Sequence, residues 1–253
     1  MIKGLYSAFS AMESAWRYQD VLANNIANSD TAGYKREFAT QQPFADVLLS
    51  QQAPVPAPIS ARIQQVVGQI GTGTFIADFA TDFGSGIVRE TGNELDIASE
   101  NGFFQVEGAD GTVFATRDGR FGRDAAGDMV TSQGYYVLDE NGQHINLPQA
   151  AVSISADGAI IDQGGEIARL AVVDYSPTQL TRAGEAYFTA SGEGQPPVGG
   201  PGLRQGFLEG SNSNLVEEMT SLLAVQRTYQ ANQAVLSKLD GTLDQAAGEL
   251  GRL

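Results

Sequence analysis

The C-terminal part of the chain repeats an apolar or aromatic residue every seven positions, and this repeat restricts the possible fold most strongly. The repeat comprises Leu215, Leu222, Tyr229, Leu236, Leu243 and Leu250. Residues at this spacing form one stripe along a helix, as in coiled coils. A helix from about residue 214 to 247 is roughly 50 Å long at 1.5 Å per residue, which exceeds what a small core covers. The repeat therefore predicts a long helix that needs a partner.

The N-terminal residues show a second amphipathic pattern. Apolar residues recur there at steps of three and four, namely Ile2, Leu5, Phe9, Met12 and Trp16, and then Ala23 and Ile26. This spacing predicts a helix of about 22 to 25 residues with one apolar face. The segment 28–33 contains Asn and Gly, which tolerate left-handed backbone, and is expected to end it.

The middle of the chain is rich in turn residues. Between residues 43 and 210 lie all 9 prolines and all of the 30 glycines except Gly4, Gly33, Gly241, Gly248 and Gly251. Strand-length runs alternate there with the hairpin-type dipeptides Asp110-Gly111, Asp118-Gly119, Asn141-Gly142 and Asp157-Gly158. Turns at this regular spacing predict an antiparallel sheet or barrel rather than βαβ units.

Two segments are predicted to be extended connections: 44–60, which contains APVPAP at 53–58, and the glycine- and proline-rich 192–202. The expected fold class is α+β, with a mainly β central domain and long terminal helices that pack together as a coiled coil. We expect a discontinuous helical assembly domain (1–35 with 211–253), an extended linker region (36–75) and an antiparallel β domain (76–210).

Composition argues against several classes of partner and site. The net charge of -15 repels polyphosphate and anionic headgroups, so nucleic acid and acidic membrane surfaces are not expected partners. Without cysteine, and with His144 as the single histidine, the chain has no disulfide framework, thiolate zinc site or multi-histidine metal cluster. It also lacks an apolar run of roughly 18 residues and the apolar core of a signal peptide. We expect no membrane insertion and, for an exported protein, no cleaved signal.

Catalytic motifs are scarce. The sequence contains no G-x-S-x-G, no P-loop and no complete G-x-G-x-x-G. His144 lies in a hairpin-like segment and is expected at the surface. Asp124, Gly127 and Asp128 resemble part of a calcium loop, but the alternating ligands and closing Glu are missing, which favours a turn. We expect no enzyme, no catalytic residue, no cofactor and no metal.

The candidate functional residues belong to a predicted assembly interface. They are Leu5, Phe9, Met12, Trp16, Ile26, Leu215, Leu222, Tyr229, Leu236 and Leu243, with Asn24, Asn25 and Asn28 at the end of the first helix. The heptad residues either close a hairpin within the chain or form a bundle of several chains, and the helix length favours the bundle. The asparagines either fix, by hydrogen bonds, the direction in which the chain leaves the first helix, or they reflect turn propensity alone.

Four groups of motifs, in order along the chain, resemble the flagellar rod and hook protein family. LANNIANSDTAGYKR at 22–36 is similar to the family's N-terminal signature, and GNELDIA, GFFQV and TRDGRF at 92–121 are similar to its central run. GFLEGSN at 206–212 and QRTYQAN at 226–232 resemble its C-terminal elements. Glu94 stands where the family usually has proline, and Ser213 where it usually has valine. The length and single β domain favour a rod subunit over a hook protein, with the distal or proximal type left open.

The resemblance implies a structural subunit of the bacterial flagellar basal body. In that family the terminal segments are unfolded during export through the flagellar secretion channel and become helical when subunits stack into a tube. The implied partners are copies of the chain, other rod and hook proteins and the export apparatus. Two other hypotheses remain: an exported β domain that binds cell-wall polymer or glycan and oligomerises through a helical stalk, and a glycosidase with a carboxylate pair.

Overall fold

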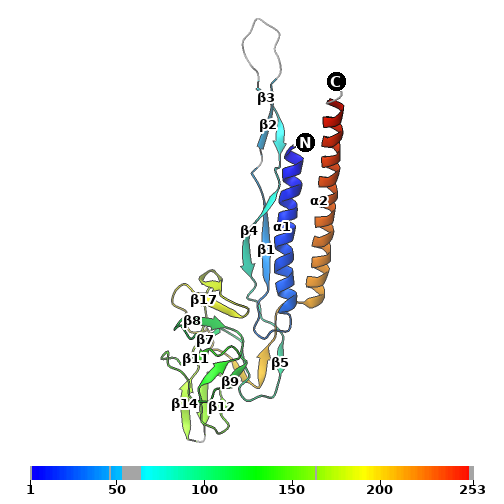
Figure 1. Ribbon diagram of the computed structural model, residues 1–253. Coiled ribbons are helices and arrows are strands. Elements are labelled where there is room, and N and C mark those ends of the chain that lie inside the picture. The colour runs from blue at the N-terminus through cyan, green and yellow to red at the C-terminus, as the bar shows by residue number, and fades with distance from the viewer. Residues whose placement is uncertain (1, 46, 53–63, 163, 251–253) are drawn as a thin grey trace. The chain divides into compact units, whose positions relative to one another are not determined.

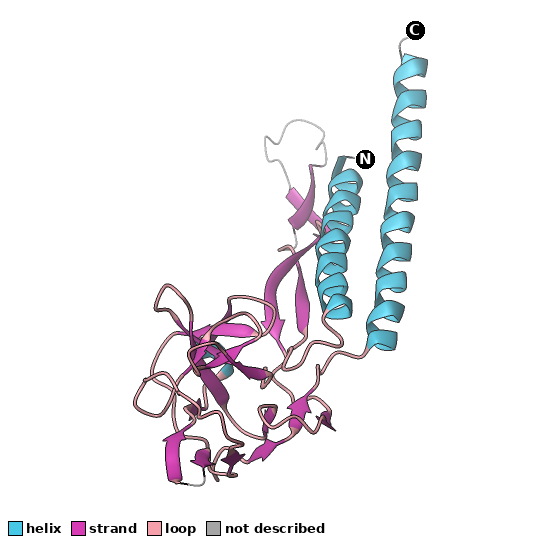
Figure 2. Cartoon of the chain, turned by 60° about the horizontal axis from the view of Figure 1, so that its bottom comes forward, coloured by secondary structure: helices cyan, strands magenta, loops and turns pink. Residues whose placement is uncertain are grey.

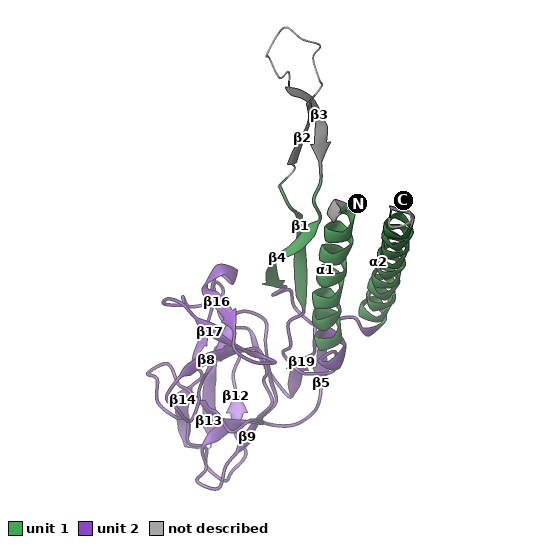
Figure 3. Cartoon of the chain, turned by 45° about the horizontal axis from the view of Figure 1, so that its top comes forward, with its two compact units in different colours: residues 1–24, 37–80, 216–253 green, residues 25–36, 81–215 purple. Residues whose placement is uncertain are grey.

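The structure, a computed structural model, describes residues 2–45, 47–52, 64–162 and 164–250 (Figure 1). The described residues form two long α-helices at the two ends of the sequence, with β structure between them (Figure 2). The chain divides into two compact units (Figure 3). Unit 1 comprises Met1–Asn24, Glu37–Ala80 and Val216–Leu253, and unit 2 comprises Asn25–Arg36 and Thr81–Leu215. The α+β class is therefore confirmed.

Unit 1 is built from both terminal helices and a long hairpin. Its elements are α1 (Ile2–Ala27), α2 (Leu215–Leu250), β1 (Glu37–Pro43), β2 (Val47–Gln52), β3 (Gln64–Ile70) and β4 (Thr74–Thr81). β1 pairs with β4, and β2 pairs antiparallel with β3. The Ser14 hydroxyl donates to the carbonyl of Thr74 at 3.2 Å, which ties α1 to β4. α1 thus has the hairpin beside it as well as α2 (Figures 1 and 3).

The structure differs from the extended linker expected at 36–75, because four strands begin in this region. The paired strands satisfy each other's backbone donors and acceptors, which a linker would leave to water. Pro43, which has no backbone N–H to donate, is the last residue of β1. The APVPAP run at 53–58 lies outside the described residues.

Unit 2 contains the remaining strands, most of them short. They are β5 (Val88–Glu90), β6 (Ile97–Ser99), β7 (Phe103–Glu107), β8 (Val113–Thr116), β9 (Phe121–Arg123), β10 (Met129–Thr131), β11 (Tyr136–Val137), β12 (Ser153–Ile154), β13 (Ala159–Asp162), β14 (Gly165–Arg169), β15 (Val172–Val173), β16 (Leu180–Arg182), β17 (Tyr187–Ala190), β18 (Leu203–Gln205) and β19 (Phe207–Glu209), with the 3-10 helix η1 (Pro177–Gln179). The largest sheet has the order β16-β17-β8-β7-β11-β10-β9, and β15 also pairs with β7. The pairings with recorded register in unit 2 are all antiparallel, as expected from the turn spacing.

The hydrophobic core of unit 2 lies on this sheet. Its fully covered members include Phe104, Val106, Met129 and Ile160, each 0% exposed. A second, smaller cluster is formed by Phe103, Ala115 and Phe188, with Phe83 and Tyr175 packed against it. Alternate residues of β7 thus face the two clusters, as the pleat of a strand requires. The 192–202 segment contains no helix and a single bridge residue, as its composition predicted.

Both predicted helices are present, and their ends follow the sequence. α1 ends at Ala27, and Gly33 in the following turn has a φ of 66°. α2 begins at Leu215 and continues to Leu250, past the expected residue 247. Within the described part of the chain, neither helix combines the length and apolar character needed to cross a bilayer.

Three of the four predicted turn glycines have positive φ: Gly111, Gly142 and Gly158. Gly119 does not. It lies against β6, where the Ile97 amide donates to the Gly119 carbonyl at 3.0 Å. A Cβ on Gly119 would lie 1.7 Å from the Ile97 carbonyl oxygen. This glycine is therefore required by close contact between two backbone segments rather than by the turn.

Replacing Gly119 with alanine is expected to destabilise unit 2 by about 1–3 kcal/mol or more, because the added methyl group forces β6 away. Gly122→Ala is the matched control, since a Cβ there would lie 4.0 Å from the Val130 carbonyl oxygen. Urea unfolding of the full chain, followed by Trp and Tyr fluorescence and β-sheet circular dichroism, measures both. Equal unfolding free energies for the two variants would contradict the close contact.

Candidate functional site: a buried junction and two exposed helix faces

Two of the sequence motifs meet at a buried ion pair in unit 2. Lys35 follows α1 in the sequence GYKR, and Glu209 ends β19 in the sequence LEGSN. The side chains are 0% and 2% exposed, and Lys35 Nζ lies 2.7 Å from Glu209 Oε1. Lys35 Nζ also donates to the Gly84 carbonyl at 2.9 Å. Lys35 and Glu209, which are far apart in sequence, are thus linked to each other and to the segment that precedes β5.

Glu209 is held by further donors. The Gly86 amide donates to Oε1 at 2.7 Å, and Arg117 Nη1 lies 3.5 Å from Oε2. The Glu209 backbone carbonyl accepts from the Gly33 amide at 2.8 Å. Burial lowers the pKa of both Lys35 and Arg117 from their ordinary values, and the Glu209 carboxylate opposes this shift in both. The carboxylate therefore compensates two cations that burial would otherwise make costly.

Asn212 completes this cluster, which we call the signature junction (Lys35, Arg117, Glu209 and Asn212). Asn212 Oδ1 accepts from the Arg36 amide at 2.7 Å, and Nδ2 donates to the Asp82 carbonyl at 2.8 Å. Arg36 Nε lies 3.1 Å from Asp82 Oδ2. Residues 36, 82 and 212 are close in sequence to three of the points where the chain passes between the two units. The signature junction therefore gathers these three connections at one place in unit 2.

The asparagines at the end of α1 have separate roles. Asn25 is 1% exposed and accepts from the Tyr34 hydroxyl at 3.0 Å. Asn24 donates to the Asp20 carbonyl at 3.0 Å, and Asn28 Oδ1 accepts from the Thr31 hydroxyl at 3.1 Å. Asn25 thus fixes the turn after α1 through a side-chain contact, and Asn24 and Asn28 make local helix-end bonds.

The predicted apolar face of α1 lies largely open. Phe9 and Trp16 are each 58% exposed, and Leu5, Met12 and Ile26 are half-buried. A different face is buried, composed of Ala8, Ser14, Ala15, Val21 and Leu22. Sequence reasoning passed over this face because most of its members are small, although Ala8, Ala15 and Leu22 are spaced by seven.

The heptad residues of α2 lie on its more covered side. Leu222, Tyr229 and Leu236 are half-buried, and Leu215 and Leu243 are 41% and 37% exposed. Among the α2 side chains that the structure describes, Glu218 alone is buried. α1 lies on this side, because a Cβ on Gly4 would be 3.6 Å from Leu239 Cδ1. A cavity of about 270 Å³ lies between the helices and is lined by Ala11, Ala15, Tyr18, Gln41, Thr74, Val225 and Thr228.

α2 also has a second apolar surface, which the heptad analysis did not find. Val216, Met219 and Leu223 lie off the heptad positions, at steps of three and four, and are 72%, 47% and 57% exposed. Exposed apolar side chains grouped on one helix indicate a contact surface. The signal for it in the sequence was weak, because its three residues span only the first three turns of α2.

The other candidate sites have ordinary structural roles. His144 Nε2 lies 2.8 Å from Glu107 Oε2, and its ring stacks on Tyr136 at the surface. Asp124 Oδ1 accepts from the amides of Ala126 and Asp128, which closes a turn as expected. Within residues 2–45, 47–52, 64–162 and 164–250, no group of three or more His, Asp or Glu side chains is placed to hold a metal ion.

Lys35→Met is expected to destabilise unit 2 by about 3–5 kcal/mol, because it leaves the buried Glu209 carboxylate without its closest cation. The double variant Lys35→Met/Glu209→Leu is expected to be less destabilised than the sum of the two single variants. Arg169→Met removes solvent-exposed pairs with Glu166, Asp157 and Glu140 and serves as a control of smaller effect. Urea unfolding of the four variants measures the coupling, and additive single and double effects would contradict the buried pair.

Three family profiles match the chain. They are described as "Flagella basal body rod protein" (residues 5–35), "Flagellar hook protein FlgE/F/G D1 domain" (residues 99–167) and "Flagellar basal body rod FlgEFG protein C-terminal" (residues 204–249). The first contains Lys35, the second contains Arg117, and the third contains Glu209 and Asn212, so all four residues of the signature junction lie inside the matched regions.

Whole-chain relatives agree with these profiles. The flagellar basal-body rod protein FlgG of Bacillus subtilis is 32% identical, with 97% of this chain and 98% of the relative covered. The FlgG protein of Borreliella burgdorferi is 33% identical over 96% and 97% of the two chains. The FlgF protein of Rhizobium meliloti is 33% identical over 99% of both. The chain therefore belongs to the flagellar basal-body rod protein family.

Proposed function

We propose that the chain is a structural subunit of the bacterial flagellar rod that assembles through α1 and α2 into a helical tube transmitting torque from motor to hook. The observation that carries the proposal is the exposure of α2, where Glu218 is the only buried side chain among those described. An isolated helix gains most of its stability from packing of its apolar face. α2 therefore requires neighbouring chains for that packing.

The energetic argument follows from the heptad residues. Full burial of a Leu side chain contributes about 1.5–3 kcal/mol relative to exposure. Leu222 and Leu236 are half-buried within the chain, and Leu215 and Leu243 are more exposed still. Much of this contribution is thus available only when further helices cover α2. A bundle of several chains, packed as a coiled coil, supplies such helices.

The aromatic face of α1 provides a second contact surface. Tyr6, Phe9 and Trp16 are 65%, 58% and 58% exposed. Aromatic side chains are enriched at interfaces because each buries a large area at low entropic cost. The aromatic face of α1 and the second apolar surface of α2 are different patches on one chain. Binding of one patch to the other patch on the next copy produces an open helical stack.

The remaining parts of the proposal rest on the family. We infer that the chain is exported through the flagellar export apparatus without a cleaved signal peptide and contacts other rod and hook proteins at the ends of its segment. Its role is mechanical, and no catalysis or nucleic-acid binding is included. The helical assembly domain is proposed to comprise 1–35 with 211–253, joined by the β1–β4 hairpin.

Leu236→Asp is expected to abolish incorporation into the rod, because it places a charge in the middle of the heptad stripe. Gln233→Asp introduces the same charge at an exposed position of α2 and is expected to assemble normally. Electron microscopy of basal bodies and swimming assays measure assembly, and urea unfolding of unit 2 checks that the fold is retained. Wild-type motility of the Leu236→Asp strain would contradict the proposed interface.

The helices are expected to form fully only in the polymer. At micromolar concentration the purified chain should give little helical circular dichroism, and protease should trim residues 1–35 and 211–253. Polymerisation should then raise the helical signal and protect both ends. A dilute monomer with fully helical, protected ends would contradict assembly-coupled folding.

A further inference from the structure

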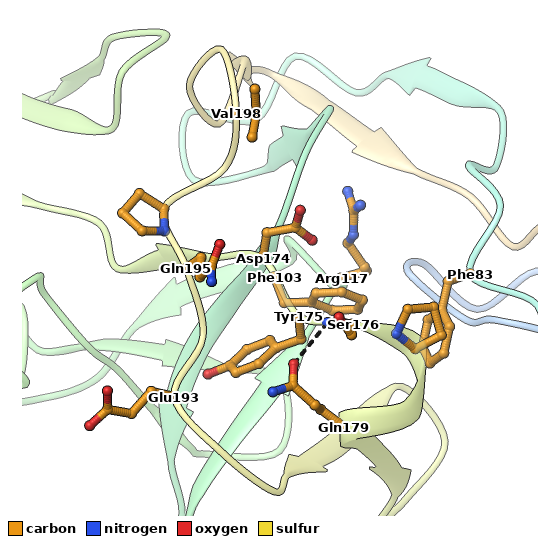
Figure 4. Close-up of a pocket in the computed structure, with 12 residues that line it drawn as sticks. Phe83, Phe103, Arg117, Asp174, Tyr175, Ser176, Gln179, Glu193, Gln195 and Val198 are labelled. Carbon is orange, nitrogen blue, oxygen red and sulfur yellow. Dashed lines mark hydrogen bonds between the residues drawn. The ribbon is translucent and has the colours of Figure 1, made fainter.

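Unit 2 contains a cavity of about 500 Å³ that the proposed helix contacts leave unused (Figure 4). It lies between the smaller aromatic cluster and the 193–198 segment, and its lining includes Phe83, Phe103, Arg117, Tyr175 and Val198. Pockets that hold small ligands or short peptide stretches have volumes of about 300–1,000 Å³. We call this cavity the aromatic pocket.

The wall of the aromatic pocket is held by ring packing and hydrogen bonds. Phe103 packs edge-on against Phe83 at 5.8 Å between ring centroids and lies 6.4 Å from Tyr175. Gln105 Nε2 donates to the Tyr175 hydroxyl at 2.9 Å, which holds that ring in place. The opposite wall is fixed by paired backbone bonds between Asp174 and Gln195, at 2.7 and 2.9 Å. The cavity is therefore already present in the chain without a ligand.

The polar lining offers donors and negative charge. Gln179 lines the pocket and its Oε1 accepts from the Ser176 amide at 3.0 Å, so the donors of this side chain are those of its NH₂ group. The carboxylates of Asp174 and Glu193 lie at the exposed rim. A matching ligand combines apolar surface, carbonyl acceptors and a cation.

We propose that the aromatic pocket binds the proline-rich segment APVPAPISAR (53–62) of a second copy of this chain, an inference that rests on the proposed self-assembly. Its prolines lack backbone N–H groups and present carbonyl acceptors only, which match the NH₂ donor of Gln179 in the pocket lining. Proline-rich segments bind aromatic-lined grooves in other proteins by the same complementarity. Arg62 supplies the cation for Asp174 and Glu193.

Cysteine cross-linking tests this contact directly, because the natural sequence contains no cysteine. A tagged full-length Pro56→Cys variant is mixed with an untagged Val198→Cys variant, polymerised and oxidised. Val198 is 92% exposed at the pocket rim. The expected product is a disulfide-linked heterodimer, at least fivefold more abundant than with Ile161→Cys, a control that is 41% exposed and does not line the pocket. Because each variant carries one cysteine, a heterodimer reports a contact between copies.

Arg62→Gln in the Pro56→Cys chain provides a second measurement. This substitution lies outside unit 2, so it leaves the pocket folded, and it is expected to lower the heterodimer yield severalfold. Polymers that form with no more Pro56–Val198 cross-link than the control overturn the inference and leave the proposed function standing. A chain that forms no polymer overturns both. A different outcome is that the chain binds purified cell-wall glycan, that Tyr175→Ala abolishes this binding, and that no cross-link forms. This outcome assigns the pocket to a glycan and overturns the inference.

Discussion

Lys35 and Glu209 are both buried away from water, and the charge of each offsets the free-energy cost of burying the charge of the other. The pair also fixes the backbone: Glu209 accepts from the amides of Gly33 and Gly86, and Lys35 donates to Gly84. A buried pair of this kind adds little net stability compared with apolar side chains, but half of it alone is costly. Its effect is to permit one arrangement of three chain segments. The connections to both terminal helices depend on that arrangement, because Arg36 and Asn212 are adjacent to it.

The sequence was sufficient to predict features set by local periodicity. The heptad residues and the spacing of Phe9, Met12 and Trp16 predicted two long helices, and the Asp-Gly and Asn-Gly dipeptides predicted three of the four turns. The buried ion pair was not predictable in this way, because its residues are separated by 174 positions and charged residues are normally exposed. The motifs GYKR and LEGSN contain both residues, but one sequence does not reveal that they meet.

Two predictions were wrong for the same reason: the structure at these positions depends on contacts with segments that are distant in sequence. The 36–75 region was expected to be a linker because of the APVPAP run at 53–58, yet β1 pairs with β4. Gly119 looked like a turn residue, yet contact with Ile97 explains it. The buried face of α1 was overlooked similarly, since Ala8 and Ser14 become core residues only through what they pack against. Tertiary contacts outweigh local propensity at each of these positions.

The exposure of α2 has a consequence for growth of the polymer. The first few chains to meet cover only part of one another's helices, whereas a chain that joins an existing end is covered from several sides at once. Early encounters are therefore short-lived, and stable addition begins only on a nucleus of several subunits. Such a system has a critical concentration, below which free chains persist without spontaneous aggregation. A preformed end acts as a seed and directs new subunits to the place where the structure is being extended.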